Sequence, residues 1–330
     1  MKKISFIAIT LIFHIISVSY SLETDSHQAL NEYNSRNALN NFSLDLYLKN
    51  NLGLQNGIEE KFNNTQIWKW FREGGLKEDI PYWYMPYLRS VNHFHNPITE
   101  QGFSGIWGTG FLSGESSIQW SQKPLGTQSP GGYYSWFDVR DYFYKALTAA
   151  DKTTRDTNYA ETFRGIGQLM HLVEDLSVPE HTRDDGHYIS YNYEDWVNDT
   201  GTDRFPNVGV DPLAGIVRIR NSDLQNFTII TPVFYDSSAL GNPNPLASVP
   251  FANLFDTRQY IGTNPNITLQ SNIGLSEYTN ANFLSPDSMF TAEFPYPAWS
   301  SVTEYDEVID LISGKKKTYL KKLGYTEGGN

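Results

Sequence analysis

Residues 167–197 read GQLMHLVEDLSVPEHTRDDGHYISYNYEDWV, and this stretch decides the expected fold. His171 and Asp175 are four residues apart, so on a helix they share one face. Pro179 cannot continue that helix, so we expect the chain to turn just before it. The turn would bring His181 back toward the side on which His171 and Asp175 lie.

The same stretch goes on to His187 and Glu194, and we expect Glu194 on a second helix that begins near Tyr191. Helical proteins build multinuclear metal sites from imidazole and carboxylate side chains that project together, and such nitrogen and oxygen ligands suit zinc. A single His and Asp pair at this spacing is more often a surface ion pair. Five ligand-type side chains around one proline-broken helix favour the metal site.

The segment HLVEDLSVPEH resembles the His-x3-Asp-x5-His signature of the zinc-dependent phospholipase C and S1/P1 nuclease superfamily. The later segment YEDWV resembles the end of that family's third metal site, and the resemblance fades after Thr200. Three earlier residues extend it: His27, Asp79 and His93, where NHFHNP resembles the family motif HFYDP. His95 stands where the family has an aromatic residue.

The resemblance implies up to three zinc ions, held by histidines, carboxylates and the first residue of the mature chain. The ligands of the first ion would be Asp79, His93, His171 and Asp175. Asp175 would also bind the second ion, together with His27 and the amine and carbonyl groups of Leu22.

The third ion would take His181, Glu194 and one further histidine, and here the sequence departs from the family pattern. The family places that histidine four residues before the carboxylate, where this chain has Ser190, a poor zinc ligand. We expect His187 to replace it, from a loop or from the same helical face.

Three charged residues after His181 have two interpretations each. Arg183 either binds a phosphate oxygen or forms a salt bridge with nearby acids. Asp184 and Asp185 are either reserve metal ligands or solvated loop acids.

The N-terminus is typical of a secretory signal peptide, because two lysines precede an apolar run over residues 4–18 and a small-x-small site at residues 19–21. The run is too short to span a membrane. We therefore expect residues 1–21 to be removed and the protein to be secreted or periplasmic. The chain has no cysteine, so any metal must be bound by His, Asp and Glu.

The chain has 330 residues and a net charge of −12. This balance argues against a long electrostatic track on duplex nucleic acid, which needs clustered Lys and Arg. It leaves single-strand cleavage open, because metal ions in a site supply positive charge. We expect a monomer whose contact with a membrane surface is at most transient.

Helical periodicity over residues 27–52, 67–73, 136–150 and 158–175 predicts a mainly α fold. We expect Gly74 and Gly75 to end the second of these helices. The resemblance implies a multi-helix phospholipase C/P1 nuclease-like bundle with long loops, and the Gly, Ser and Pro content of residues 102–132 predicts one such loop.

Two parts follow the signal peptide in this prediction. Residues 22–200 form the helical metal-binding region, and residues 201–330 form a less regular, loop-rich part packed on it. Short strands are expected near residues 215–235, and helices near residues 275–284 and 304–323.

The leading interpretation is a secreted zinc-dependent phosphodiesterase that hydrolyses phospholipid headgroup phosphoesters with a metal-activated water. Asp79 would orient or deprotonate that water. Ile80 and Ser90 stand at two of the family's choline-binding positions, so the headgroup is open.

Two alternatives remain. A single-strand nuclease would use aromatic side chains to stack bases, and the candidates are Tyr82, Trp83, Tyr84 and Tyr87. A non-catalytic secreted protein that keeps the metal fold is favoured by Ser190 and by the divergence after Thr200.

Overall fold

The computed structural model describes part of the chain, and that part is mainly helical, as predicted. The described residues are 24–38, 42–80, 87–105, 108–186, 251–262, 273–283 and 285, with four short strands at 210–211, 216–217, 304–309 and 316–321. Among these residues, no helix combines the length and the apolar character needed to cross a membrane.

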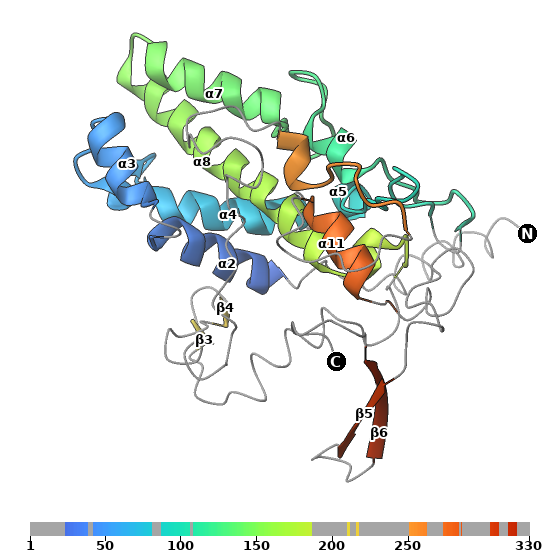
Figure 1. Ribbon diagram of the computed structural model, residues 1–330. Helices are drawn as coiled ribbons and strands as arrows, with labels where there is room; N and C mark the ends of the chain where they lie inside the picture. Colours follow the sequence, from blue (N-terminus) through green and yellow to red (C-terminus); the bar gives the residue numbers. More distant parts are fainter. Residues whose placement is uncertain are drawn as a thin grey trace, which may run out of the picture.

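Four long helices lie side by side in the order α7 (Trp136–Thr148), α8 (Lys152–Glu174), α4 (Ile67–Asp79) and α2 (Thr24–Arg36), as Figure 1 shows. Apolar side chains from α4, α7 and α8 meet in one hydrophobic core that also takes in α3 (Leu44–Asn51). The buried members of this core are Leu48, Ile58, Phe62, Ile67, Trp68, Phe71, Ala146, Tyr159, Ala160 and Phe163.

Shorter elements connect and follow these helices. They are the 3-10 turns η1 (Gly57–Glu59), η3 (Asp175–Ser177), η4 (Glu180–Thr182) and η5 (Phe251–Leu254), the helices α5 (Tyr87–Ser90), α6 (Ser117–Ser121) and α11 (Leu275–Asn282), and the strands β1 (Lys61–Phe62), β2 (Thr65–Gln66), β3 (Val210–Asp211), β4 (Ile216–Val217), β5 (Glu304–Ile309) and β6 (Lys316–Lys321). The strands form three antiparallel pairs, β1 with β2, β3 with β4 and β5 with β6.

Local sequence explains where α7 and α8 begin. Ser135 and Asp138 form a capping box at the start of α7, each side chain bonding to the backbone N–H of the other. Asp151 caps α8 by accepting a hydrogen bond from the backbone of Thr154 at 2.8 Å. At its other end α8 stops at Glu174, and the turn predicted before Pro179 is present.

The single helix predicted over residues 27–52 is wrong, because two helices, α2 and α3, occupy this stretch. Asn37 follows α2 and donates its side-chain N–H to the carbonyl of Tyr33, the kind of bond by which asparagine competes with helical pairing. Ser43 then caps α3 by accepting from the backbone of Leu46 at 3.3 Å.

The predicted helix end at Gly74 and Gly75 is also wrong, because α4 runs through both glycines to Asp79. Their role is close packing. A Cβ atom on Gly74 would lie 2.2 Å from the carbonyl oxygen of Arg164 on α8, and one on Gly75 would lie 3.0 Å from the carbonyl oxygen of His27 on α2. The two glycines therefore let three helix backbones approach one another.

Two further expectations need correction. The loop predicted over residues 102–132 contains the helix α6, with Trp120 buried. The helix predicted over residues 304–323 is instead the antiparallel pair of β5 and β6, in which the Cα atom of Tyr305 faces that of Leu320. The Ser313-Gly314 pair between the two strands is a turn signal that the helical periodicity obscured. The helix predicted near residues 275–284 is confirmed as α11.

The described C-terminal segments pack against the helices that precede them. Phe255 lies in a buried cluster with Trp120, Leu172 and Leu176. Asn280 of α11 donates its side-chain N–H to the carbonyl of Thr182. Through these contacts, residues 251–262 and 273–283 pack against the C-terminal end of α8 and the turns that follow it.

We predict that Gly74→Ala lowers the free energy of unfolding by about 1–3 kcal/mol, because the new methyl group would overlap the backbone of α8. At an uncrowded helical position, a Gly→Ala substitution raises the free energy of unfolding by about 1 kcal/mol, so the expected effect here has the opposite sign. Urea denaturation measures both. Glu73→Ala, on the same helix and partly exposed, is the control with little change. A stabilised Gly74→Ala protein would contradict the packing described.

Candidate metal centre

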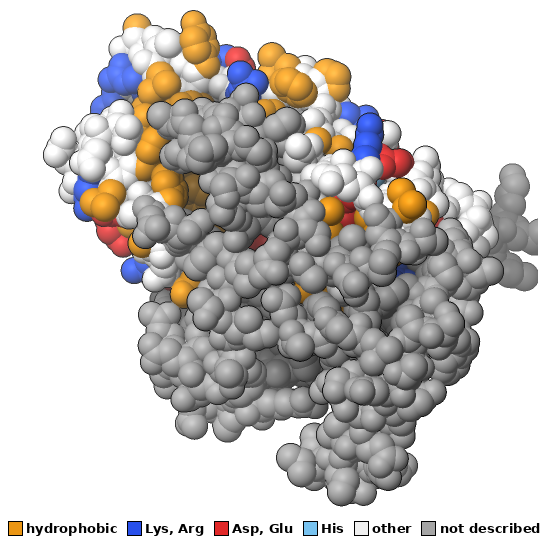
Figure 2. All heavy atoms as spheres, viewed as in Figure 1, with side chains coloured by type: hydrophobic (Ala, Val, Ile, Leu, Met, Phe, Trp, Pro, Cys, Tyr) orange, Lys and Arg blue, Asp and Glu red, His pale blue; other side chains and the backbone are white. Residues whose placement is uncertain are grey.

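Five of the predicted ligands lie together in the interior of the protein. His27 comes from the first turn of α2, Asp79 from the last residue of α4, and His93 from the segment after α5. His171 lies in the last turn of α8 and Asp175 directly follows that helix. All five are fully buried, and no histidine is visible among the described residues on the face drawn in Figure 2.

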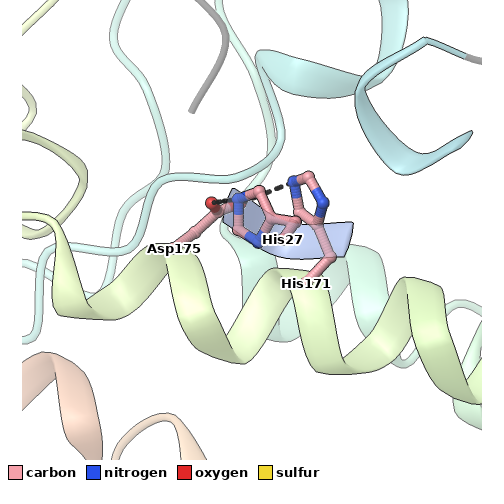
Figure 3. Close-up of side chains that lie close together, drawn as sticks. All are labelled: His27, His171 and Asp175. Atoms are coloured by element: carbon pink, nitrogen blue, oxygen red, sulfur yellow. Dashed lines mark ion pairs between the residues drawn. The ribbon is translucent and has the colours of Figure 1, made fainter. Parts of the chain in front are cut away.

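The carboxylate of Asp175 is the centre of the cluster. Its Oδ1 lies 3.0 Å from Nε2 of His27, and its Oδ2 lies 2.9 Å from Nδ1 of His93 and 3.3 Å from Nε2 of His171. Figure 3 draws the pairs that Asp175 makes with His27 and His171, whose rings stack with their centroids 3.6 Å apart.

Asp79 completes a second side of the cluster. Its Oδ1 lies 3.4 Å from Nδ1 of His93 and 3.5 Å from Nε2 of His171, and neither Asp79 oxygen has a hydrogen-bond partner among the described residues. The ligand atoms of Asp79, His93 and His171 lie within 4.8 Å of one another, as do those of His27, His171 and Asp175. Each of these two groups can hold a metal ion, but they share Nε2 of His171, which can bind only one ion at a time.

Each histidine of the cluster has a neighbour on the ring nitrogen that faces away from Asp175. Nδ1 of His27 lies 2.7 Å from Oε2 of Glu174. Nδ1 of His171 lies 2.7 Å from the carbonyl oxygen of Gly75, to which it can donate. Nε2 of His93 lies 3.7 Å from Oε1 of Glu78. Partners of this kind orient metal-binding histidines.

Glu78 is itself held in a buried network. Arg89 binds both of its carboxylate oxygens, at 3.1 and 2.8 Å, and the indole N–H of Trp120 donates to Oε1 at 2.9 Å. Burial would raise the pKa of Glu78, but the adjacent guanidinium lowers it to about 2. Arg89 therefore compensates the charge of Glu78 and leaves the charges of Asp79 and Asp175 to other groups.

The carboxylates of the cluster make its histidines basic. Burial would lower the pKa of His93, but the negative charge of Asp175 and the nearby carboxylate of Glu78 raise it to about 9. The pKa of His171 is raised well above its ordinary value against the same effect of burial, by Asp175 and Asp79. Burial would raise the pKa of Asp175, but the charges of His171, His93 and His27 hold it well below its usual range.

The residues present fit a metal ion. Both oxygens of Asp79, both ring nitrogens of His93 and Nε2 of His171 are buried with no hydrogen-bond partner among the described residues. Buried polar atoms without partners are costly, and a shared cation would satisfy Asp79, Nδ1 of His93 and Nε2 of His171 together.

The remaining predicted ligands lie beside this cluster or outside the described part of the chain. His181, in η4, is buried, stacks on Phe94 at 4.3 Å between centroids, and has its ring centroid 6.4 Å from that of His93. Leu22, His187 and Glu194 lie outside the described residues, as does Ser190. The predicted third site therefore stays a prediction.

The three charged residues after His181 are held by hydrogen bonds or burial within the protein. Arg183 is buried, and its guanidinium donates to the backbone carbonyl of Asn280 on α11, so it ties the loop after α8 to the C-terminal segment. Asp184 accepts a hydrogen bond from the backbone of Ser104 at 2.7 Å. Asp185 is buried.

His95, which stands where the resemblance expects an aromatic residue, has both ring nitrogens engaged. Nδ1 lies 2.8 Å from the hydroxyl of Ser116, and Nε2 lies 2.8 Å from Oδ2 of Asp256. Its backbone N–H donates to the carbonyl of His181 at 2.9 Å. His95 therefore links three segments around the cluster. Glu100 and Asp256 lie close enough to it to form a third ligand-type group.

Sequence reasoning missed Glu78, Arg89 and Glu174. Glu78 and Glu174 each directly precede a predicted ligand, so their position next to Asp79 and Asp175 was a usable signal. Arg89 had no such signal, because its contact with Glu78 depends on how α5 packs against α4.

Compared with protein-family models, curated proteins and solved structures, the chain matches none of them.

We predict that the metal-free protein becomes less stable as the pH rises from 6.5 to 9. A histidine whose pKa is raised on folding stabilises the folded state fully below its unfolded pKa, and this stabilisation is lost as the pH passes the folded pKa. For His93, with a folded pKa of about 9, the loss is at most about 3 kcal/mol. His27 and His171 shift in the same direction.

Urea denaturation in a chelating buffer measures this dependence. Buried tyrosines with raised pKa, such as Tyr134 and Tyr142, affect stability only above about pH 10, outside the chosen range. His93→Gln should flatten the slope between pH 6.5 and 9. A slope equal to that of the unaltered protein would contradict the assignment to His93.

Proposed function

We propose that the protein is a zinc-dependent phosphodiesterase of the phospholipase C type, with the helical bundle of the phospholipase C and S1/P1 nuclease superfamily. The observation that supports it is the meeting of His27, Asp79, His93, His171 and Asp175 in one buried cluster. These residues come from four separate segments, and they are five of the six described residues that the sequence resemblance implies as ligands. The sixth, His181, lies beside the cluster.

Zinc is the metal that this ligand set favours. Three imidazoles and two carboxylates offer nitrogen and oxygen donors, which zinc binds in tetrahedral sites, whereas calcium and magnesium prefer oxygen alone. Asp79, His93 and His171 would hold one ion, with Asp175 beside them. His27 and Asp175 of the overlapping group would hold a neighbouring ion, since Nε2 of His171 has one lone pair and can bind only one of the two.

Zinc bound here supplies a water of lowered pKa and neutralises charge on the phosphoryl oxygens. The chain provides the rest. Asp79 has two buried oxygens without hydrogen-bond partners among the described residues, so one can accept the proton of the attacking water while the other stays a ligand. The second ring nitrogens of His27 and His171 are held by Glu174 and the backbone of Gly75, which fixes the direction of the ligand atoms.

A phospholipid headgroup phosphoester is the proposed substrate, and secretion after removal of residues 1–21 is the proposed location. Of the candidate base-stacking residues of a nuclease, Tyr82, Trp83 and Tyr84 lie outside the described residues, and Tyr87 is the first residue of α5. The choice between phospholipid and single-stranded DNA therefore depends on direct assay.

We predict that the protein, stripped with a chelator and reloaded with Zn²⁺, hydrolyses a zwitterionic phospholipid in detergent micelles, and that Asp175→Asn lowers this rate by at least about 100-fold. Loss of the shared carboxylate should exceed the 10–100-fold effects of outer-shell partners. Asp156→Asn, on the helix α8 that precedes Asp175 and paired with Lys152 at the surface, is the control that keeps full activity. Mass spectrometry under native conditions counts the ions.

Three other outcomes discriminate among the alternatives. Zinc-dependent cleavage of single-stranded DNA with no lipid hydrolysis would replace the phospholipase proposal by the nuclease. Bound zinc with neither activity would identify a non-catalytic metal protein. Failure of the unaltered protein to bind zinc would refute the metal centre.

A further inference from the structure

We infer that Glu174 is a positioning residue, which holds the imidazole of His27 by Nδ1 so that Nε2 is the atom presented to a metal ion. This inference deepens the proposed function and rests on it. Glu174 itself would not be a ligand.

The chain positions two adjacent carboxylates against one ring. Glu174 is the last residue of α8 and Asp175 follows it. Oε2 of Glu174 lies 2.7 Å from Nδ1 of His27, and Oδ1 of Asp175 lies 3.0 Å from Nε2 of the same ring. The two ring nitrogens are thereby assigned to different neighbours, one beside the cluster and one within it.

The oxygens of Glu174 lie apart from the ligand cluster. Within the described residues, the group that can hold a metal at this side consists of His27, His171 and Asp175, and it does not include Glu174. The side chain of Glu174 is 13% exposed, whereas those of His27 and Asp175 are fully buried. Its contribution is therefore to the orientation of His27.

The ring of His27 needs a partner that fixes its orientation, because stacking on His171 alone would allow it to rotate by a half-turn. The ring of His27 lies against that of His171 with an angle of 18° between the planes, which fixes the plane. A half-turn about the Cβ–Cγ bond keeps that plane but replaces Nε2 by a ring carbon on the side of Asp175. Only the first orientation leaves Nδ1 within reach of Glu174.

The same contact selects the tautomer. A neutral imidazole carries its proton on one nitrogen and its lone pair on the other. With the proton on Nδ1, that N–H donates a hydrogen bond to the carboxylate of Glu174, and Nε2 keeps the lone pair that a metal needs. For His171 the backbone carbonyl of Gly75 selects the tautomer, and a side-chain substitution cannot remove a backbone carbonyl. For His27 the side chain of Glu174 selects the tautomer, so its effect can be tested by substitution.

The experiment compares the full protein with Glu174→Ala and Glu174→Gln, and uses Glu73→Gln on α4 as a matched control. Competitive titration with a zinc chelator gives the affinity for each ion. Two-bond ¹H–¹⁵N spectra of histidine-labelled protein report which nitrogen of His27 is protonated and which binds the metal. Circular dichroism verifies that the variants fold.

Glu174→Ala is expected to weaken one zinc ion by about 10–100-fold and to leave the other unchanged. Its His27 signal should lose the pattern of a proton on Nδ1 and a metal on Nε2. Glu174→Gln should be weakened less, since its amide oxygen still accepts a hydrogen bond. Glu73→Gln should match the unaltered protein.

Two results would overturn the inference, and they differ. Zinc bound by Glu174→Ala with unchanged affinity and an unchanged His27 spectrum would refute the positioning role while leaving the proposed function intact. Absence of zinc from the unaltered protein would refute the proposed function and the inference with it.

Discussion

Backbone contact between helices is the constraint on which the rest of the structure depends. Gly74 of α4 and Gly167 of α8 lie where an added Cβ atom would come within 2.2 Å of the carbonyl oxygen of the facing helix. Asn31 of α2 adds a bridge, because its side-chain N–H group donates to carbonyls of both α4 and α8, each at 3.0 Å. The close approach brings the ends of three helices together, and the candidate ligands lie at those ends.

This geometry buries several carboxylates, and the surrounding residues compensate only part of their negative charge. Arg89 compensates Glu78 through two hydrogen bonds to its carboxylate. Asp79 and Asp175 face histidines instead. Two buried carboxylates beside neutral imidazoles would be strongly unfavourable, so protons or metal ions must supply positive charge. The carboxylates raise the pKa of His93 and His171, which favours protonated imidazoles when no metal is bound.

The sequence was most informative where chemistry and local periodicity coincide. His171 and Asp175 lie at one helical end as predicted, and the sequence order of His27, Asp79 and His93 was enough to nominate the cluster that the fold assembles. The helix predicted over residues 304–323 failed because its pattern fits a strand pair equally well. Gly74 was misinterpreted because a glycine that ends a helix and one that admits a neighbouring backbone look alike in sequence. Only tertiary packing separates the two.

The ends of the helices make this cluster a favourable place for a cation. Asp79 lies in the last turn of α4 and Asp175 directly follows α8. Helix C-termini carry partial negative charge from their unpaired carbonyls. A carboxylate at such an end makes the electrostatic potential there more negative. Acidic residues ordinarily avoid this position, and two of them converge here in the interior. A divalent ion would offset the repulsion between these negative groups, because the C-terminal carbonyls and the carboxylates would stabilise its positive charge. The arrangement that is least favourable for the empty fold is therefore the one best suited to binding metal.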